Sequence, residues 1–240
     1  KTNLLVDHVD LDTLRGLLSD ADILVYGAPD IPHQTERELF KLLSQSHESL
    51  IAVHLSPYGL SGPYSELAGC ELTANALSGI TQRIGAPDRE PLTLPLAQAA
   101  YQAGYAAACG AACGLIARMN SVQGQVVEVS ETEALATVHA GYSVTRYQTA
   151  GIEEKRAGNR MALLPYPQTV LPCADGFVAL NTPEGRQWGR LLELMGSPAW
   201  GRDERYRSRI KNSLPPRVDE LDAYFKTWLQ DYSKEQFYTL

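Results

Sequence analysis

Short apolar runs and helical periods alternate over the first part of the chain. Asp22–Tyr26 and Leu50–Leu55 are short, nearly continuous apolar runs. Between them, Thr35–Ser44 has apolar residues at helical spacing, with Glu36 and Glu38 in its first turn. Strand, helix and strand in this order predict a parallel sheet, because parallel strands need a crossover of about a dozen residues or more.

A helix rich in small residues is predicted farther along. Pro95–Met119 contains three glycines among many alanines. Because small residues let a neighbouring backbone approach closely, we expect this helix to be central and tightly packed. Gln125–Val129 is typical of a further strand, and Ser130-Glu-Thr-Glu133 predicts a capping box at the start of the next helix.

The last part of the chain has a different pattern. A stretch rich in Gly, Pro and charge has no apolar period. Beyond it, Thr169–Cys173 and Phe177–Leu180 flank the hairpin-turn sequence Ala174-Asp-Gly176. We therefore predict an α/β domain with an open, Rossmann-like parallel sheet over residues 1–151, a linker over 152–170 and a smaller α+β domain over 171–240.

Composition narrows the classes of function. The 240 residues are 44% hydrophobic, with a formal net charge of -7 and no long run of basic residues. This pattern argues against a nucleic-acid or anionic-membrane surface. Apolar stretches end well short of the ~18 residues that a spanning helix needs. We expect a soluble, cytoplasmic protein with no nucleic-acid or membrane partner.

The cysteines and histidines show no metal-ligand spacing. The four cysteines form no CxxC pair, so we expect buried free thiols. The histidines are expected at the surface or satisfied in the core, and no metal is expected; they are His8, His33, His47, His54 and His139. Because the chain begins at Lys1 and stops at Leu240 inside a predicted helix, we expect it to be a piece of a longer protein.

Several motifs follow one another along nearly the whole chain. They are SPYGLSGPY (Ser56–Tyr64), AGCELTANALSG (Ala68–Gly79), IGAPDREP (Ile84–Pro91), RAGNR (Arg156–Arg160) and CADGFVAL (Cys173–Leu180). In this order they resemble the family III CoA-transferases of the CaiB/BaiF type. That family includes formyl-CoA transferase, carnitine dehydratase-like proteins and alpha-methylacyl-CoA racemases.

The resemblance implies a reaction and a partner. Coenzyme A would be a substrate, moved between an acyl-CoA and a free carboxylic acid. The partner would be a second copy in a homodimer, or a second CoA-transferase unit of the same protein, because family members form interlocked dimers.

The family's nucleophile is missing. Family transferases use an aspartate, because a carboxylate can form a mixed anhydride with the acyl group and then a thioester with CoA. That aspartate usually precedes a glycine by four residues at the start of the small-residue helix. Placing Gly104 on that glycine puts Ala100 at the nucleophile, whereas counting from Pro95 puts Gln98 there. Neither side chain can form the anhydride.

Two other family features are altered. The racemases have a His-Asp pair where this chain has Cys70 and Glu71. Glu71 keeps a carboxylate, so it is a candidate catalytic residue; alternatively it is a helix-start acid near the N-terminal dipole. The family's CoA-binding loop has Asn and Arg, whereas Tyr26–Asp30 has neither and gains an acid.

The loop after the second predicted strand keeps the family's pattern. Its glycines Gly59 and Gly62 are candidate substrate-binding residues, because glycine lets the backbone approach an acyl group; alternatively they only form a turn.

Our hypothesis is a family III homologue whose unit lacks its nucleophile and serves as the non-catalytic half. One alternative is an acyl-CoA racemase or isomerase that uses Glu71. The other is a non-enzymatic acyl-CoA-binding or scaffold subunit.

Overall fold

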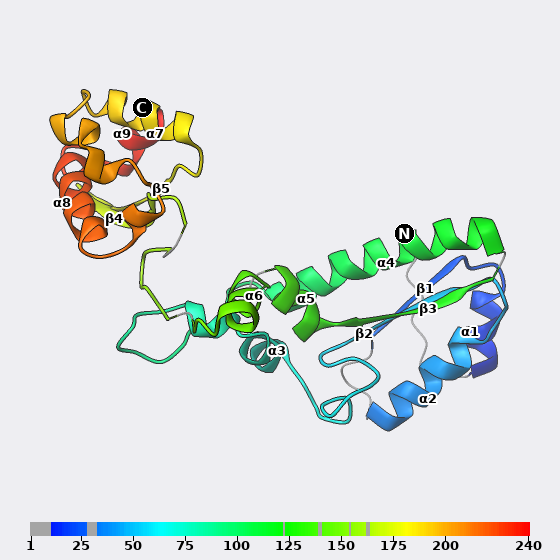
Figure 1. Ribbon diagram of the computed structural model, residues 1–240. Coiled ribbons are helices and arrows are strands. Elements are labelled where there is room, and N and C mark those ends of the chain that lie inside the picture. Colours follow the sequence, from blue (N-terminus) through cyan, green and yellow to red (C-terminus); the bar gives the residue numbers. More distant parts are fainter. Residues whose placement is uncertain (1–10, 28–32, 122, 139–140, 154, 162–163) are drawn as a thin grey trace. The chain divides into compact units, whose positions relative to one another are not determined.

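The computed structural model of the chain describes residues 11–27, 33–121, 123–138, 141–153, 155–161 and 164–240. It has two compact units (Figure 1). The first comprises Lys1–Ile84 and Pro91–Glu154, and the second comprises Gly85–Glu90 and Lys155–Leu240. The chain thus enters the second unit twice, first through the short segment 85–90. The domain and linker ranges proposed from the sequence stay predictions.

The first unit is built on a three-stranded parallel sheet. Its strands are β1 (Ile23–Tyr26), β2 (Ile51–Ser56) and β3 (Gln125–Ser130), in the order β1-β2-β3. In the register of the central strand, Ile51 pairs with Ile23 on one side and with Gln125 on the other. Ile51 and Val53 are fully buried, as in a parallel strand that is covered on both faces. The predicted α/β fold with a parallel sheet is confirmed.

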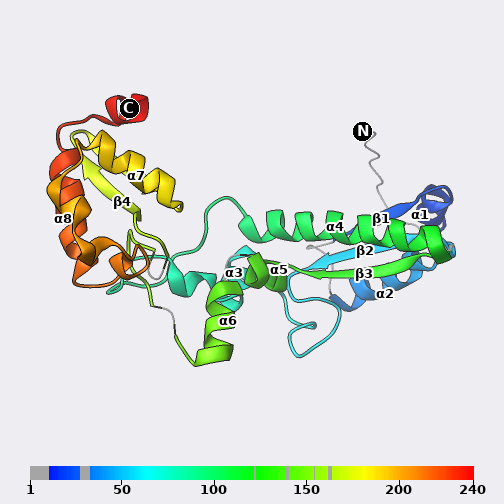
Figure 2. The same ribbon diagram turned by 45° about the horizontal axis from the view of Figure 1, so that its top comes forward.

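Helices cover both faces of this sheet (Figure 2). The helix α4 (Gln98–Ser121) packs on one face against β2 and β3, and α2 (His33–Ser44) lies on the other. The remaining helices of the unit are α1 (Leu11–Leu18), α3 (Glu71–Leu77), the 3-10 turn Ile80–Arg83, α5 (Glu131–Val138) and α6 (Gly141–Ala150).

Small side chains bring α4 close to the sheet. Ala103, Ala107 and Ala111 are buried at intervals of four residues, which forms one ridge along the helix. A Cβ added at Gly110 would lie 2.6 Å from Val127, and one at Gly114 would lie 2.9 Å from Ile51. The predicted tight packing of this helix is confirmed on the side that faces the sheet, while its central position stays a prediction.

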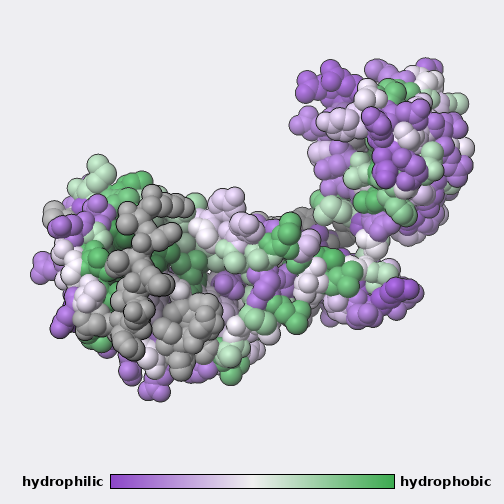
Figure 3. Space-filling model, turned by 180° about the vertical axis from the view of Figure 1, so that it is seen from behind, coloured by the Kyte–Doolittle hydropathy of each residue, from purple (hydrophilic) through white to green (hydrophobic). Residues whose placement is uncertain are grey.

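Large apolar side chains remain on the opposite side of α4. Tyr105 (69% exposed), Ile116 (64%) and Met119 (84%) lie away from the alanine ridge. The same side exposes Cys109 and Cys113, because the ridge takes the positions that face the sheet. The prediction that the cysteines are buried is therefore wrong for these two; it is also wrong for Cys70, which is exposed, and Cys173 is half-buried. Figure 3 shows apolar surface interspersed with hydrophilic surface on one face of the molecule.

The second unit joins a β-hairpin to helices. Its elements are β4 (Gln168–Cys173), β5 (Gly176–Asn181), α7 (Gly185–Leu194), the 3-10 turns Ala199–Arg202, Glu204–Tyr206 and Lys211–Ser213, α8 (Arg217–Leu229) and α9 (Lys234–Thr239). The two strands are antiparallel, and the predicted hairpin turn lies where Cys173 pairs with Gly176. Phe225 and Leu229 of α8 are fully buried in the core beneath the hairpin.

Two of the sequence motifs meet within the second unit. The Arg156 side chain of RAGNR donates a 3.2 Å hydrogen bond to the carbonyl of Ala86 in IGAPDREP. Arg160 of the same motif pairs with Asp219 at 2.8 Å and with the buried Asp222 at 2.6 Å. Both motifs therefore have structural contacts that hold their segments in this unit.

Candidate functional site

The loop that follows β2 is fixed by side chains from three elements. The Gly59 amide donates to the Ser56 hydroxyl at 2.9 Å, and the Leu60 amide donates to the carboxylate of Glu128 on β3. Arg37 of α2 donates to the Leu60 carbonyl and pairs with Glu66. Because contacts from β2, β3 and α2 hold one short segment, the loop has a defined shape.

The two candidate glycines of this loop both have positive φ. Gly59 has a φ of 87° and Gly62 a φ of 90°, values that favour glycine. A Cβ on Gly59 would also clash with the Glu128 carboxylate, whereas nothing lies within 4 Å of one on Gly62. The turn thus explains both glycines, and a substrate-binding role for them stays a prediction.

The two candidate positions for the missing nucleophile lie in the first turn of α4. Gln98 is the first helical residue and is half-buried, while Ala100 is exposed. Leu96 and Ala97, directly before the helix, both have positive φ, at 66° and 49°. Such backbone is strained in residues other than glycine and is held in place by its surroundings. The first turn of α4 has no acidic residue of its own.

The carboxylate at this position comes from another helix. Glu71, the first residue of α3, accepts hydrogen bonds on Oε1 from the Ala99 amide and from the Asn75 side chain, both at 2.8 Å. Its Oε2 accepts from the Ala100 amide at 3.3 Å. The first amides of a helix lack intrahelical partners, and a carboxylate also suits the positive end of the helix dipole. Glu71 therefore caps α4.

A second carboxylate lies close to Glu71. Burial raises the pKa of Glu131, the first residue of α5, and the charge of Glu71 raises it further. The N-termini of α3, α4 and α5 thus contribute to one polar cluster. In the sequence, the one signal at Glu131 is the capping-box pattern that contains it, in which the Glu133 amide donates to the Ser130 hydroxyl at 3.3 Å.

Cys70 precedes Glu71 and faces solvent. Hydrogen bonds from the backbone and side chain of Thr73 lower the pKa of the Cys70 thiol. The Thr73 hydroxyl also accepts from the Cys70 amide at 2.9 Å, which completes a capping box at the start of α3. These contacts give Cys70 a structural role at the helix terminus.

Part of the segment Tyr26–Asp30, compared above with a CoA-binding loop, lies outside the described residues, namely Ala28, Pro29 and Asp30. The first residue of that segment, Tyr26, is described. Its ring stacks on His54 with centroids 6.0 Å apart, and packs against Phe40 at 5.7 Å. Burial, followed by the charge of Glu36, raises the pKa of the Tyr26 hydroxyl. Tyr26 is thus a packing residue of the first unit.

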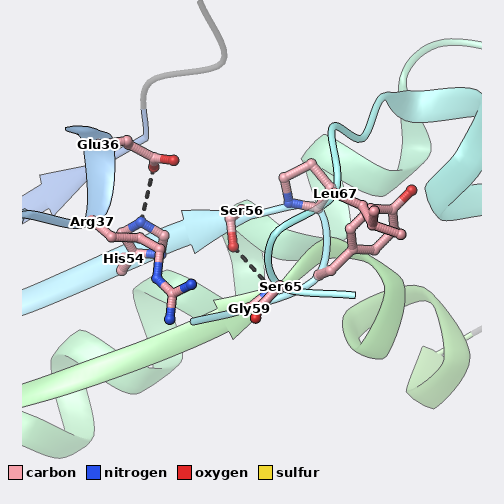
Figure 4. A pocket seen from close by; sticks show the side chains of 9 residues that line it. Glu36, Arg37, His54, Ser56, Gly59, Ser65 and Leu67 are labelled. Carbon is pink, nitrogen blue, oxygen red and sulfur yellow. Dashed lines mark hydrogen bonds and ion pairs between the residues drawn. The ribbon is translucent and has the colours of Figure 1, made fainter. Parts of the chain in front are cut away.

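The buried pair His54 and Glu36 lies beside the loop (Figure 4). Nε2 of His54 on β2 is 2.9 Å from Oε1 of Glu36 on α2, and their side chains are 1% and 4% exposed. His54 lies in the core, one of the two predicted placements, and its Nδ1 has no hydrogen-bond partner among the described residues. Both nitrogens of His47 do have partners, Ser49 and Ala21. His8, His139 and the side chain of His33 lie outside what the structure describes.

No group of His, Cys, Asp or Glu side chains that could hold a metal ion occurs in the described part of the chain. Over the same residues, no helix is both long and apolar enough to cross a bilayer.

Comparison with known proteins gives these features a family context. The model of CoA-transferase family III matches residues 5–240. Succinate–glutarate CoA-transferase of Agrobacterium fabrum is 29% identical over 181 residues, which are 74% of this chain and 45% of that protein. Mouse alpha-methylacyl-CoA racemase is 30% identical over 157 residues, which are 64% of this chain and 41% of that protein.

The fold has solved counterparts. A CaiB/BaiF family protein from Brucella suis superposes with a TM-score of 0.73 at 22% identity, over 95% of this chain and 60% of that one. The chain therefore spans somewhat less than half the length of the curated relatives named above, and about three fifths of this structural neighbour.

Proposed function

The chain belongs to CoA-transferase family III, and from this premise we propose that it is the non-catalytic unit of a CoA-transferase. The proposal rests on the residues that occupy the first turn of α4. Gln98 and Ala100 occupy the two candidate nucleophile positions. The Glu71 carboxylate, which reaches the Ala99 and Ala100 amides in this turn, accepts three hydrogen bonds.

The chemistry explains why this arrangement disfavours transfer. A carboxylate oxygen must attack the thioester carbonyl, so that a C–O bond forms, the C–S bond breaks and CoA leaves as a thiolate. The thiolate then attacks the enzyme's own acyl carbon, which releases the first acid and leaves CoA on the enzyme. A glutamine amide is a far weaker nucleophile than a carboxylate, and alanine has no nucleophile. The Glu71 oxygens already accept from helix amides.

A non-catalytic unit needs a partner, and α4 offers a surface for one. Tyr105, Ile116 and Met119 form an exposed apolar stripe on its outer side. Large apolar side chains gathered on one face are typical of protein interaction sites. We place there either a second copy of the chain or a second CoA-transferase unit of the same protein. That unit would bind the acyl-CoA and the carboxylic acid.

A second candidate function is supported by the neighbouring carboxylates. Glu71 and Glu131 are close enough for the charge of one to raise the pKa of the other. Pairs of acids in different environments are common in proton transfer, as an acyl-CoA racemase or isomerase requires. This alternative predicts exchange of the α-proton of a 2-methylacyl-CoA with deuterated solvent, and loss of that exchange in Glu71→Gln.

A non-enzymatic acyl-CoA-binding or scaffold subunit is the third reading. It predicts CoA binding by the chain without transfer and without α-proton exchange, and nothing in the described residues favours it over the first proposal.

Restoring the nucleophile tests the main proposal. We expect no transfer of CoA from succinyl-CoA to glutarate by the unchanged chain, and a gain of transfer in Gln98→Asp or Ala100→Asp, whichever position matches the family's aspartate. The control is Gln102→Asp, one turn farther into α4, which should gain nothing. Transfer by the unchanged chain, at a rate that Glu71→Gln abolishes, would contradict the proposal.

A further inference from the structure

A small cavity lies beside His54, and the proposed function does not use it. The cavity has a volume of about 10 Å³, close to the room for one water molecule. Its lining includes Glu36, Arg37, His54, Ser56 and Gly59 (Figure 4). Its walls thus include both the buried His54–Glu36 pair and the first residues of the loop after β2.

The unpaired nitrogen of His54 calls for a partner. Its side chain is 1% exposed, yet Nδ1 has no hydrogen-bond partner among the described residues. A buried polar atom without a partner costs about 1–3 kcal/mol, so such atoms usually contact ordered water. Because Nε2 faces the Glu36 carboxylate, the proton of the neutral ring belongs on Nε2. Nδ1 is then a buried hydrogen-bond acceptor on a ring that lines a cavity the size of a water molecule.

The same cavity adjoins the contacts that hold the loop. Ser56, two residues after His54 and on the same face of β2, accepts the Gly59 amide. Leu60 is held by Arg37 through its carbonyl and by Glu128 through its amide. Both charged side chains act on the ring of His54 electrostatically, Glu128 favouring its protonated form and Arg37 opposing it.

We propose that this cavity holds one water molecule that donates a hydrogen bond to Nδ1 of neutral His54, and that protonation of His54 loosens the loop around Gly59 and Leu60. Protonation puts a hydrogen on Nδ1, so the water can no longer donate there. The new positive charge attracts Glu128 away from the Leu60 amide and repels Arg37, which holds the Leu60 carbonyl. The proposal stands whether or not the loop binds an acyl group.

The direction of the pH dependence follows from burial. Burial, the largest cause, lowers the pKa of His54; the carboxylates of Glu36 and Glu128 act in the opposite direction, and Arg37 adds to the lowering. The neighbouring Tyr26 of β1 stays neutral because its own pKa is raised. The unfolded chain therefore takes up a proton near pH ~6.5, before the folded chain does. The contribution of neutral His54 to the unfolding free energy of the first unit is therefore complete above that pH, and it falls as the pH drops below it.

Nuclear magnetic resonance of the whole 240-residue chain with ¹⁵N-labelled histidine and backbone tests the proposal. Between about pH 8 and about pH 5, the range in which histidine titrates, the ring of His54 should start as the Nε2–H form. The Gly59 and Leu60 amide signals should shift with the midpoint of the His54 ring. At the upper pH, cross-relaxation should connect bound water with the His54 ring.

Variants distinguish a response of the loop to His54 protonation from other effects of low pH on the protein. His54→Gln should abolish the transition of the Gly59 and Leu60 signals, whereas His47→Gln, whose ring has two protein partners, should leave it unchanged. If His54→Gln does not fold, Glu36→Gln gives the same test, because removing that carboxylate should move the common midpoint to lower pH. The proposal is overturned if the neutral ring carries its proton on Nδ1, if no bound water contacts it, or if the loop signals titrate independently of His54.

Discussion

The two units of this chain are packed in opposite ways. In the second unit, large rings fill the core, and Phe225 contacts Tyr166, Trp188 and Trp200 with centroids 5.9 to 6.1 Å apart. In the first unit, alanines and glycines of α4 fill the space against the sheet, while its large apolar side chains lie at the surface. The second unit thus completes its own core, whereas the first brings backbones close together and leaves an apolar face open.

The difference has a chemical consequence. Close packing in the first unit places the first turn of α4 within hydrogen-bond distance of Glu71 on α3. Buried polar groups differ as well. In the second unit, the Asp222 carboxylate accepts the Tyr166 hydroxyl at 2.7 Å and pairs with Arg160, whereas His54 in the first unit keeps one nitrogen without a protein partner. Thr169 Oγ1 and Asn212 Oδ1 of the second unit also lack a partner among the described residues, so the contrast concerns this ion-paired carboxylate and this histidine alone.

Phe225→Ala should have the largest effect. The ring is fully buried in the aromatic core, and truncating a buried Phe to Ala costs about 3–5 kcal/mol of unfolding free energy. All three tryptophans, Trp188, Trp200 and Trp228, lie in this unit, so tryptophan fluorescence during urea unfolding reports on it alone. Tyr224→Ala, whose ring is partly exposed, serves as the control and should cost much less. Equal losses would show that the ring core is not what stabilises the unit.

Gly114→Ala should come next, now in the first unit. The added methyl group would meet Ile51 at 2.9 Å in the densely packed interface, and overpacking costs about 1–3 kcal/mol. Gly104→Ala, in the same helix but with nothing within 4 Å, should instead stabilise the unit by about 0.4–1 kcal/mol. Far-ultraviolet circular dichroism during thermal unfolding measures both. If both variants change the stability in the same direction, the close approach of α4 to the sheet is contradicted.

Glu71→Ala should have a smaller effect, because it removes a helix cap. Loss of a capping side chain costs about 0.5–2 kcal/mol. Hydrogen exchange should quicken at the Ala99 and Ala100 amides, which lose their acceptor, but not at Ala107 in the middle of α4. Unchanged exchange at the Ala99 and Ala100 amides would contradict the capping role of Glu71.

Glu131→Gln should have the smallest effect, and the size of this effect depends on pH. The pKa of this carboxyl is raised in the folded chain by burial and by Glu71, so ionising it at neutral pH opposes folding. The amide should therefore stabilise the first unit near neutral pH, with the gain disappearing as the pH falls below the carboxyl's unfolded value of about 4.3. Urea unfolding near neutral pH and below about pH 4.3 measures this difference in stability. A gain of equal size at the acidic pH would contradict the raised pKa of Glu131.

Local patterns in the sequence were enough to predict the sheet and the packing of α4. The apolar runs marked β1 and β2, and the small residues of α4 indicated its close approach to the sheet. The contacts of the site depend instead on residues that are far apart in the chain. Glu71 caps amides that lie 28 and 29 residues later, and Glu36 contacts a histidine 18 residues later. Neither pairing has a local signal, because each arises only when separate elements pack.

The most direct test of the central claim is mass spectrometry of the native full-length protein after incubation with an acyl-CoA and hydroxylamine. Hydroxylamine converts an enzyme carboxyl group that is activated as a mixed anhydride or as a CoA thioester into a stable hydroxamate. The modified residue can therefore be identified. A non-catalytic unit predicts no hydroxamate on any carboxylate of residues 1–240, while Gln98→Asp or Ala100→Asp, treated alike, serves as the positive control. A hydroxamate on Glu71 or Glu131 in the unchanged protein would contradict the account, since it would show a relocated nucleophile in an active unit.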